Sequence, residues 1–448
     1  MESIMLDYTN CLSSVVGKDG ISLSELENYE THMAGCIEEI EKESPGFMKL
    51  PYSNISKQFD VLDENTAFAE NIIILGIGGS ALGATAVNAA LCGVNPRRQL
   101  YVCDNSDPTY LSKILEKVKL DKSVFIVVSK SGSTAETMAS FLVIRKHLDK
   151  IRDGYKKHLI FITDPEKGVL RKLSQEEDIL TFDIPSDVGG RFSVLSAVGM
   201  VPSHLLNFDV DSILAGAREM DKRVREKALF KNPAALNALI HVLMMKKGKS
   251  ISVMMPYSNE LKRLADWYVQ LWAESLGKRF DISGNVVETG QTPIGALGAT
   301  DQHSQLQLYN EGPRDKIITM IRVERHPHDI SIPNIYPKEE RLSYFDDHTL
   351  GDLMNYEQLA TSITLTDNGR PNLTLLFPCI SENVLGQFFY MYEMQTAITA
   401  KLMNVNAFDQ PGVEAGKRAT YALMGRKGYE NIRDEIISKL GVVKKHYV

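Results

Sequence analysis

The chain has 448 residues, of which 44% are hydrophobic, so it is long enough to bury large cores in two or three domains. Its formal net charge of −7 argues against nonspecific nucleic-acid binding. The five cysteines form no CxxC pair, which excludes a disulfide framework or a zinc site and fits a reducing compartment. No signal-peptide pattern and no apolar run of about 20 residues is present, so we expect a cytoplasmic protein that does not bind membranes.

The first fifty residues are predicted to be helical. Ser22 and Glu25 have the spacing of a capping box, and Ile21 and Leu26 are placed to form a hydrophobic staple. Apolar residues then recur at helical spacing as far as Glu43. We expect an N-terminal helical segment over residues 1–55.

Short apolar runs alternate with helical stretches from about residue 70 to residue 185. The predicted strands are 72–75, 100–103, 124–128, 158–163 and 180–182, and the predicted helices are 81–92, 108–119 and 134–149. This alternation is typical of a parallel sheet with helices on both faces. It predicts a first α/β domain over residues 56–205.

The second half of the chain repeats this theme. Helices are predicted at 211–225, 232–246 and 384–402, and strands at 250–255, 317–323 and 373–377. We therefore expect a second α/β domain over residues 206–403 and a C-terminal helical arm over residues 404–448.

A glycine-dense segment, the glycine turn (residues 76–83), follows the first predicted strand. Its glycines would let the backbone approach a ligand, and the helix that follows could receive an anion at its N-terminus. Gly76, Gly78 and Ala81 loosely fit the dinucleotide-binding pattern, and Asp104 could bind a ribose hydroxyl. An NAD-dependent dehydrogenase is therefore one hypothesis, and a tight connection without a ligand is another.

Serine and threonine hydroxyls gather in a hydroxyl-rich loop (residues 129–137) after the strand predicted at 124–128. The loop also contains Lys130, and a helix is predicted to begin near its end. Several donors around one small anion suit a phosphate monoester, although the Walker A pattern is absent. The alternative is a helix cap, in which Ser133 or Thr134 acts alone.

Two further segments contain charged side chains that suit catalysis. In the arginine loop (residues 187–193), Gly189 and Gly190 precede Arg191, whose guanidinium could bind an oxyanion; a turn with a surface salt bridge is the alternative. Glu274 lies three residues after Leu271 and continues the apolar face of a predicted helix. A carboxylate on that face suits a general base, unless it only pairs with Lys278.

His303 and Lys417 are weaker candidates. His303 lies in a polar segment and could transfer protons near neutral pH, although a lone histidine is usually structural. Lys417, taken alone, would be an ordinary lysine on a helix surface.

Together these segments resemble the glucose-6-phosphate isomerase (phosphoglucose isomerase) family in its shorter bacterial form. They occur in the family's order, and two of them, the arginine loop and the segment 409–417, are specific signatures. The matching residues are Gly78 to Ser80, Ser129 to Thr134, Gly189 to Ser193, Glu274, Ser275, Gln302, His303, Asp409, Gln410, Gly412, Val413, Glu414 and Lys417. The resemblance implies an α/β fold of two sugar-isomerase (SIS) sandwich domains. It also implies interconversion of glucose 6-phosphate and fructose 6-phosphate without metal or cofactor.

The resemblance also implies roles for individual residues. Glu274 would move the proton between C1 and C2, Arg191 would stabilise the enediolate, and His303 and Lys417 would help to open the ring. The implied substrate-binding residues are Gly79, Ser80, Ser129, Lys130, Ser131, Ser133, Thr134, Gly190 and Gln410. The partners would be a sugar phosphate and a second copy of the chain, with His303 completing the neighbouring site. Nucleic acid is not an expected partner.

A sugar-phosphate-sensing binding module remains a third hypothesis. Such a module would share the hydroxyl-rich loop but would not need Glu274, His303 and Lys417 together.

Overall fold

The structure is a computed structural model that describes residues 3–93, 96–151, 154–443 and 446. Its contacts divide the chain into two compact units, Met1–Ala407 and Phe408–Val448. The finer division predicted from the sequence, into 1–55, 56–205, 206–403 and 404–448, stays a prediction. Residues 1–2, 94–95, 152–153, 444–445 and 447–448 of those segments lie outside the described residues.

The first sheet has the strand order β3-β2-β4-β5-β6, and all its pairs are parallel, as predicted. The strands are β2 (Asn71–Leu75), β3 (Gln99–Cys103), β4 (Ser123–Val128), β5 (Leu159–Thr163) and β6 (Thr181–Asp183). Each of the five predicted strands is present, and its ends differ from the prediction by no more than one residue. Continuous β-branched and apolar runs, such as Ile72 to Ile74, suit a sheet that is buried on both faces.

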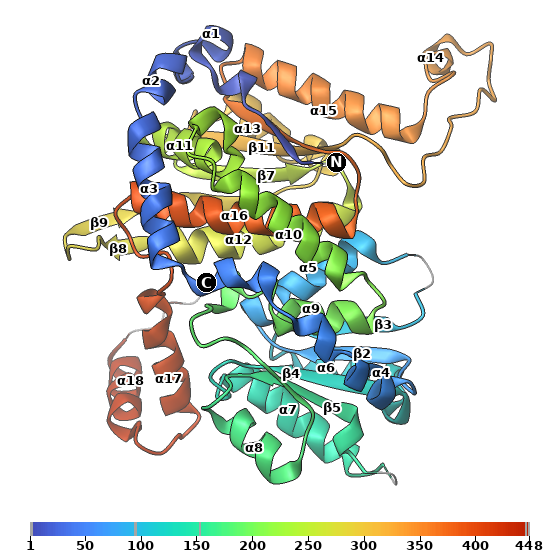
Figure 1. Cartoon of the computed structure of the whole chain (residues 1–448), viewed down its shortest axis with the longest axis vertical. Helices are drawn as coiled ribbons and strands as arrows, with labels where there is room; N and C mark the ends of the chain where they lie inside the picture. Colours follow the sequence, from blue (N-terminus) through green and yellow to red (C-terminus); the bar gives the residue numbers. More distant parts are fainter. Residues whose placement is uncertain (1–2, 94–95, 152–153, 444–445, 447–448) are drawn as a thin grey trace. The chain divides into compact units, whose positions relative to one another are not determined.

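Helices cover both faces of this sheet. Ile72 and Ile74 point into a core shared with α5 (Leu82–Leu91), whereas Ile73 and Leu75 point into a core on the opposite face. Figure 1 shows α7 and α8 on one side of the sheet and α5 and α9 on the other. The helices are α6 (Pro108–Lys117), α7 (Ala135–Leu148), α8 (Val169–Glu177) and α9 (Ala197–Leu205). The prediction of helices on both faces is confirmed.

The second sheet has the order β1-β12-β11-β7-β10 and is parallel except for its antiparallel edge strand β1. The strands are β1 (Met5–Asp7), β7 (Ile251–Pro256), β10 (Thr292–Gly295), β11 (Lys316–Val323) and β12 (Asn372–Phe377). The expectation that the first fifty residues are all helical is wrong at β1, which pairs with β12. Strand β10 was not predicted from the sequence either.

Helix α12 (Lys262–Leu276) links the two sheets. It packs on α5 beside the first sheet and on β7 and β10 of the second. It also contacts the buried helix α16 (Glu382–Leu402), which packs against α10 (Val210–Val224) and α11 (Pro233–Lys246) (Figure 1). Glu274 therefore lies near the C-terminal end of a helix held firmly between two layers.

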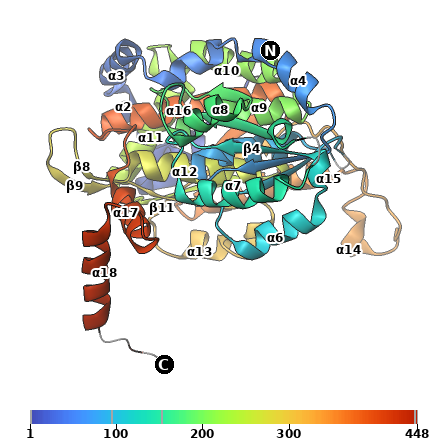
Figure 2. The same ribbon diagram turned by 90° about the horizontal axis from the view of Figure 1, so that it is seen from below.

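Shorter elements surround this framework. The capping box of Ser22 and Glu25 is confirmed at the start of α2. The β8–β9 hairpin and the segment that carries α14 extend away from the sheets (Figure 1 and Figure 2). The remaining helices of the first unit are α1 (Ser13–Val16), α2 (Leu23–Glu27), α3 (Glu30–Glu43), α4 (Asp60–Thr66), α13 (Leu306–Glu311), α14 (Glu340–Ser343) and α15 (Leu350–Asp367), and the hairpin strands are β8 (Lys278–Phe280) and β9 (Val286–Thr289).

The second unit is built from the short turn η12 (Pro411–Val413) and the helices α17 (Glu414–Leu423) and α18 (Glu430–Val442). Across the described parts of both units, no helix combines the length and the apolar character needed to cross a membrane.

Candidate active site

Three loops with predicted functions follow the carboxyl ends of parallel strands in the first sheet. The glycine turn follows β2, the hydroxyl-rich loop follows β4, and the arginine loop comes after β6. Because the strands are parallel, these loops lie at one edge of the sheet. The chain runs from β2 to β3 on one side and then to β4 on the other, so the strand order reverses between β2 and β4. That reversal point is where open α/β sheets bind ligands.

The glycine turn and the arginine loop are in close backbone contact. A Cβ atom built on Gly79 would lie 2.2 Å from the carbonyl oxygen of Gly190, so no other residue fits at Gly79 without movement of the backbone. Gly78 has a φ of +57°, a conformation that favours glycine. Ser193 Oγ also donates hydrogen bonds to the carbonyls of Gly190 (2.6 Å) and Gly79 (3.5 Å). The half-buried Ser80 ends the short turn η5 (Gly78–Ser80) within this segment.

The hydroxyl-rich loop is ordered by its own side chains. Ser129 Oγ and Thr134 Oγ1 are 2.9 Å apart, and the Ser133 N–H donates to Ser131 Oγ at 3.2 Å. Thr134 occupies the N-cap position of α7 but makes no capping hydrogen bond. Within the described part of the chain, the N–H groups of Ser131 and Thr134 have no hydrogen-bond partner. Together with the first turn of α7, they present unpaired donors that suit an anion.

Lys130 extends from the hydroxyl-rich loop to the start of the arginine loop. Its Nζ donates hydrogen bonds to the carbonyls of Ser186 (2.7 Å) and Val188 (2.8 Å). Two of the three donors of the ammonium group are therefore used by main-chain oxygens.

Arg191 and Glu274 meet as a cation and a carboxylate. Arg191 Nη1 lies 3.5 Å from Glu274 Oε2, and the Arg191 side chain is only 3% exposed. The guanidinium is fixed by hydrogen bonds from Nε to Ser275 Oγ (2.7 Å) and from Nη2 to the carbonyl of Ala407. The Glu274 side chain is 30% exposed, so its carboxylate is more accessible than the core-facing position predicted from the sequence.

Two side chains contact Glu274, Gln270 on α12 and Lys278 at the start of β8. Gln270, one turn earlier, donates from Nε2 to Glu274 Oε2 at 3.3 Å. The sequence analysis did not predict this contact, although the i, i+4 spacing was a signal for it. Lys278 Nζ donates to the main-chain carbonyl of Glu274 at 2.9 Å.

His303 lies apart from this cluster in the contacts of the chain. It ends the turn η11 (Thr300–His303) and is exposed, and no hydrogen bond joins its ring to Arg191 or Glu274 in the described residues. The neighbouring Gln302 is fixed by Tyr257, Thr361 and the carbonyl of Glu357. Among the described residues, no hydrogen bond or ion pair therefore joins His303 to Glu274 of the same chain.

Gln410 and Lys417 belong to the second unit. Gln410 precedes η12, and Lys417 Nζ lies 2.9 Å from Glu414 Oε1 on the exposed surface of α17.

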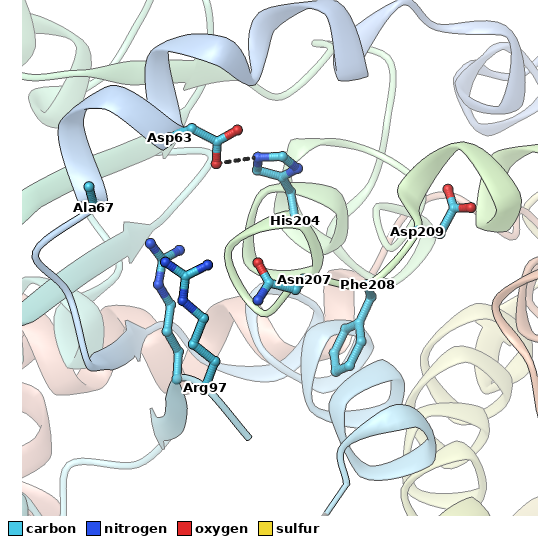
Figure 3. A pocket seen from close by; sticks show the side chains of 8 residues that line it. Asp63, Ala67, Arg97, His204, Asn207, Phe208 and Asp209 are labelled. Atoms are coloured by element: carbon cyan, nitrogen blue, oxygen red, sulfur yellow. Dashed lines mark hydrogen bonds and ion pairs between the residues drawn. The ribbon is translucent and has the colours of Figure 1, made fainter. Parts of the chain in front are cut away.

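A separate cavity of about 460 Å³ contains none of the predicted site residues (Figure 3). In it, His204 Nε2 lies 3.0 Å from Asp63 Oδ1. The residues that line this cavity are Asp63, Ala67, Arg97, Arg98, His204, Asn207, Phe208 and Asp209. Among the described residues, no group of acidic, histidine and cysteine side chains could hold a metal ion.

Comparisons with known proteins agree with one another. Residues 63–434 match the profile of the family described as phosphoglucose isomerase. The chain is 41% identical over 455 residues to a glucose-6-phosphate isomerase of Carboxydothermus hydrogenoformans, with 97% of each chain covered. It is 43% identical over 442 residues to a glucose-6-phosphate isomerase of Rubrobacter xylanophilus, with 96% of this chain and 100% of that protein covered.

One solved structure extends this similarity to the fold. It is a glucose-6-phosphate isomerase of Chlamydia trachomatis, which aligns with a TM-score of 0.83 at 20% identity. The alignment covers 98% of this chain and 92% of the other. At this identity the comparison supports the fold alone.

Proposed function

This chain belongs to the phosphoglucose isomerase family, and we propose that it interconverts glucose 6-phosphate and fructose 6-phosphate with Glu274 as the base that moves the proton. The reaction is an intramolecular oxidation and reduction that serves glycolysis and gluconeogenesis. The ion pair between Glu274 and Arg191 is the observation that supports these roles most strongly.

The proton transfer needs a carboxylate and a nearby cation. Removal of a proton beside a carbonyl places negative charge on oxygen, and a fixed cation stabilises the resulting enediolate. Arg191 is held by Ser275 and Ala407, so its charge is already oriented before the reaction. Glu274 is partly exposed, so a substrate carbon can reach its carboxylate.

The hydroxyl-rich loop is assigned to the phosphate group. Hydroxyls of Ser129, Ser131, Ser133 and Thr134, with the unpaired N–H groups of the loop, would surround the anion. Anchoring the phosphate there would orient C1 and C2 toward Glu274 without contributing to the chemistry itself. The sugar-contacting residues in this proposal are Gly79, Ser80, Gly190 and Gln410.

His303 and Lys417 are assigned to ring opening, which needs a proton donor or acceptor at the ring oxygen. In this proposal, as the family resemblance implies, His303 is donated to the site of a second copy. The active form is therefore a homodimer in this proposal. A cytoplasmic location belongs to it too, and it is supported by five cysteines that form no disulfide in the described residues.

The proposed reaction is tested by giving the protein fructose 6-phosphate with a metal chelator and without nucleotide, and by following glucose 6-phosphate with a coupled dehydrogenase. We expect steady turnover. No glucose 6-phosphate would contradict the proposal.

A titration with NADH fluorescence separates this proposal from the dehydrogenase hypothesis. Asp104, the residue that hypothesis needs for a ribose, is exposed in the loop after β3. We expect no binding of the nucleotide, and saturable binding would favour the dehydrogenase.

A further inference from the structure

Lys130 joins two of the loops that build the site. Its backbone lies in the hydroxyl-rich loop after β4, and its ammonium group binds the carbonyls of Ser186 and Val188, 2.7 Å and 2.8 Å away. These carbonyls belong to the segment that leads directly into Gly189, Gly190 and Arg191. The Lys130 side chain therefore contacts the backbone just before Arg191, and this backbone determines the position of Arg191.

The same segment also contacts the turn η3 (Gly46–Tyr52). Lys49 Nζ lies 2.9 Å from Asp187 Oδ2, and the rings of Phe47 and Phe192 stack with their centres 5.3 Å apart. Because Lys49 and Asp187 are both well exposed, their ion pair is a weak restraint. The two hydrogen bonds from Lys130 fix main-chain atoms directly, one of them at the buried Val188.

Small displacements of this segment affect the reactive groups, because the arginine loop is in close contact with the glycine turn and carries the fixed Arg191 side chain. The carbonyl of Gly190 touches Gly79, and the Arg191 guanidinium is fitted between Ser275, Ala407 and Glu274. A catalytic group that is misplaced by about 1 Å can lose ~100-fold in rate.

The Lys130 ammonium group makes no direct ion pair in the described residues, although its charge helps to lower the pKa of Asp164, and its hydrogen bonds go to neutral carbonyls. A lysine that served only as a phosphate ligand would leave its donors available to the loop. Here two of the three donors are used by the neighbouring segment. This arrangement favours an effect on the position of Arg191 over a direct role in binding phosphate.

We propose that Lys130 is a positioning residue that sets the place of Arg191 beside Glu274 through the carbonyls of Ser186 and Val188. This inference rests on the proposed function, and it replaces the expected contact of the Lys130 ammonium group with the phosphate. Lys130 is then expected to affect kcat, whereas the hydroxyls and N–H groups of the loop determine the affinity for phosphate.

Steady-state kinetics of Lys130→Met test the inference, with Lys113→Met as a control at an exposed lysine on α6. We expect kcat for fructose 6-phosphate to fall by about 10- to 100-fold. The inhibition constant of inorganic phosphate should change by less than about threefold, because the loop donors remain. Retained kcat, or a rise of tenfold or more in the phosphate constant, would overturn the inference.

A double-mutant cycle with Arg191→Lys identifies the route of the effect. If Lys130 acts through the Arg191 guanidinium, adding Lys130→Met to Arg191→Lys should cost less than about threefold in kcat. The same loss in both backgrounds would contradict the inference.

A readout without turnover separates this inference from the proposed function. Arg191 is almost fully buried, so phenylglyoxal should modify it slowly in the wild type and several times faster in folded Lys130→Met, as measured by peptide mass spectrometry. Unchanged modification of Arg191 would overturn the inference. An inactive wild type would instead contradict the proposed function. If Lys130→Met does not fold, Lys130→Gln, which keeps a shorter donor, is compared in the same way.

Discussion

Arg191 gives the site a buried, permanently charged group whose hydrogen bonds are already made. A guanidinium offers planar, forked donors, and three of its contacts here are to Ser275, Ala407 and Glu274. A lysine at the same place keeps the charge but cannot make all these contacts at once.

Arg191→Lys should therefore lower kcat by about 100- to 1000-fold, because a pre-oriented charge that stabilises an oxyanion is lost. The KM for fructose 6-phosphate should change much less, since the phosphate is held elsewhere. Stopped or continuous coupled assays over a range of substrate concentrations measure both constants. A variant with near-normal kcat would exclude Arg191 as the group that stabilises the enediolate.

Glu393 is a fully buried carboxyl group, unlike the partly exposed Glu274. It lies in the middle of α16 with no exposed surface, and neither carboxyl oxygen has a hydrogen-bond partner in the described residues. Burial raises the pKa of Glu393 well above its ordinary value of 4.5, so the folded protein keeps this group protonated where the unfolded chain releases the proton.

This shift predicts how stability depends on pH. Below pH 4.5 both states hold the proton, and the ionisation of this group does not change stability with pH. As the pH rises above that value the unfolded state ionises first, so stability falls by at most about 1.4 kcal/mol per pH unit until the folded-state pKa is passed.

Glu393→Gln should remove this fall and unfold at a higher urea concentration than the wild type at pH 7. Urea titrations at several pH values measure the effect, with Glu64→Gln on the exposed surface of α4 as the control. Equal urea midpoints for wild type and Glu393→Gln at pH 7 would contradict this prediction, because they would mean that the folded chain stabilises the carboxyl group of Glu393.

At the scale of elements, Arg98 links the ends of two helices. It is buried, and it donates to the carbonyls of Thr66 and Ala69 at the end of α4 and of Leu205 at the end of α9. The carbonyls of Ala69, just beyond α4, and of Leu205 have no other hydrogen-bond partner in the described residues, whereas the Thr66 carbonyl also accepts from the Ala69 N–H at 2.9 Å. A cation near a helix C-terminus is favourable.

Arg98→Met should lower the free energy of unfolding by ~3 kcal/mol, because the carbonyls of Ala69 and Leu205 lose their donor and that of Thr66 loses one of two. Arg97→Met, at the exposed neighbouring residue, should have little effect. Chemical denaturation of both variants makes the comparison. If both variants lost a similar free energy of unfolding, the effect would come from the positive charge of this segment and not from the hydrogen bonds to the helix ends.

Central strands were predictable from the sequence because burial on both faces leaves a continuous apolar signal. The runs at Ile72 to Ile74 and Val124 to Val128 are of this kind. Edge strands lack this signal: β10 contains Pro293 and Gly295, which weaken a strand prediction, and β1 has only three residues. Both lie at the margins of the second sheet, where a proline is tolerated and pairing on one side suffices.

The composition of the candidate site was predictable, but its contacts were not. Loop residues such as Ser129 and Arg191 could be selected by their chemistry and by the strands before them. The bonds from Lys130 to Ser186 and Val188, and from Arg191 to Ser275 and Ala407, join residues far apart in the chain. No local pattern encodes them, because they depend on how the sheet and α12 are packed.

At the scale of the whole molecule, the question is whether each site draws residues from two chains. Coexpressed Glu274→Gln and His303→Ala variants test this, since each alone should be almost inactive. If His303 acts in the neighbouring site, half of the dimers are mixed and one of their two sites is intact, so about a quarter of wild-type activity should return. If both residues act within one chain, no activity returns.

The proton transfer by Glu274 is tested most directly by following fructose 6-phosphate in deuterium oxide with nuclear magnetic resonance. In the wild type we expect repeated enediolate formation to place deuterium at C2 of glucose 6-phosphate. In Glu274→Gln, isomerisation and deuterium uptake should both fall by at least about 100-fold, the usual contribution of a general base. Wild-type isomerisation without deuterium uptake, or uptake at the wild-type rate in Glu274→Gln, would contradict the proposed mechanism.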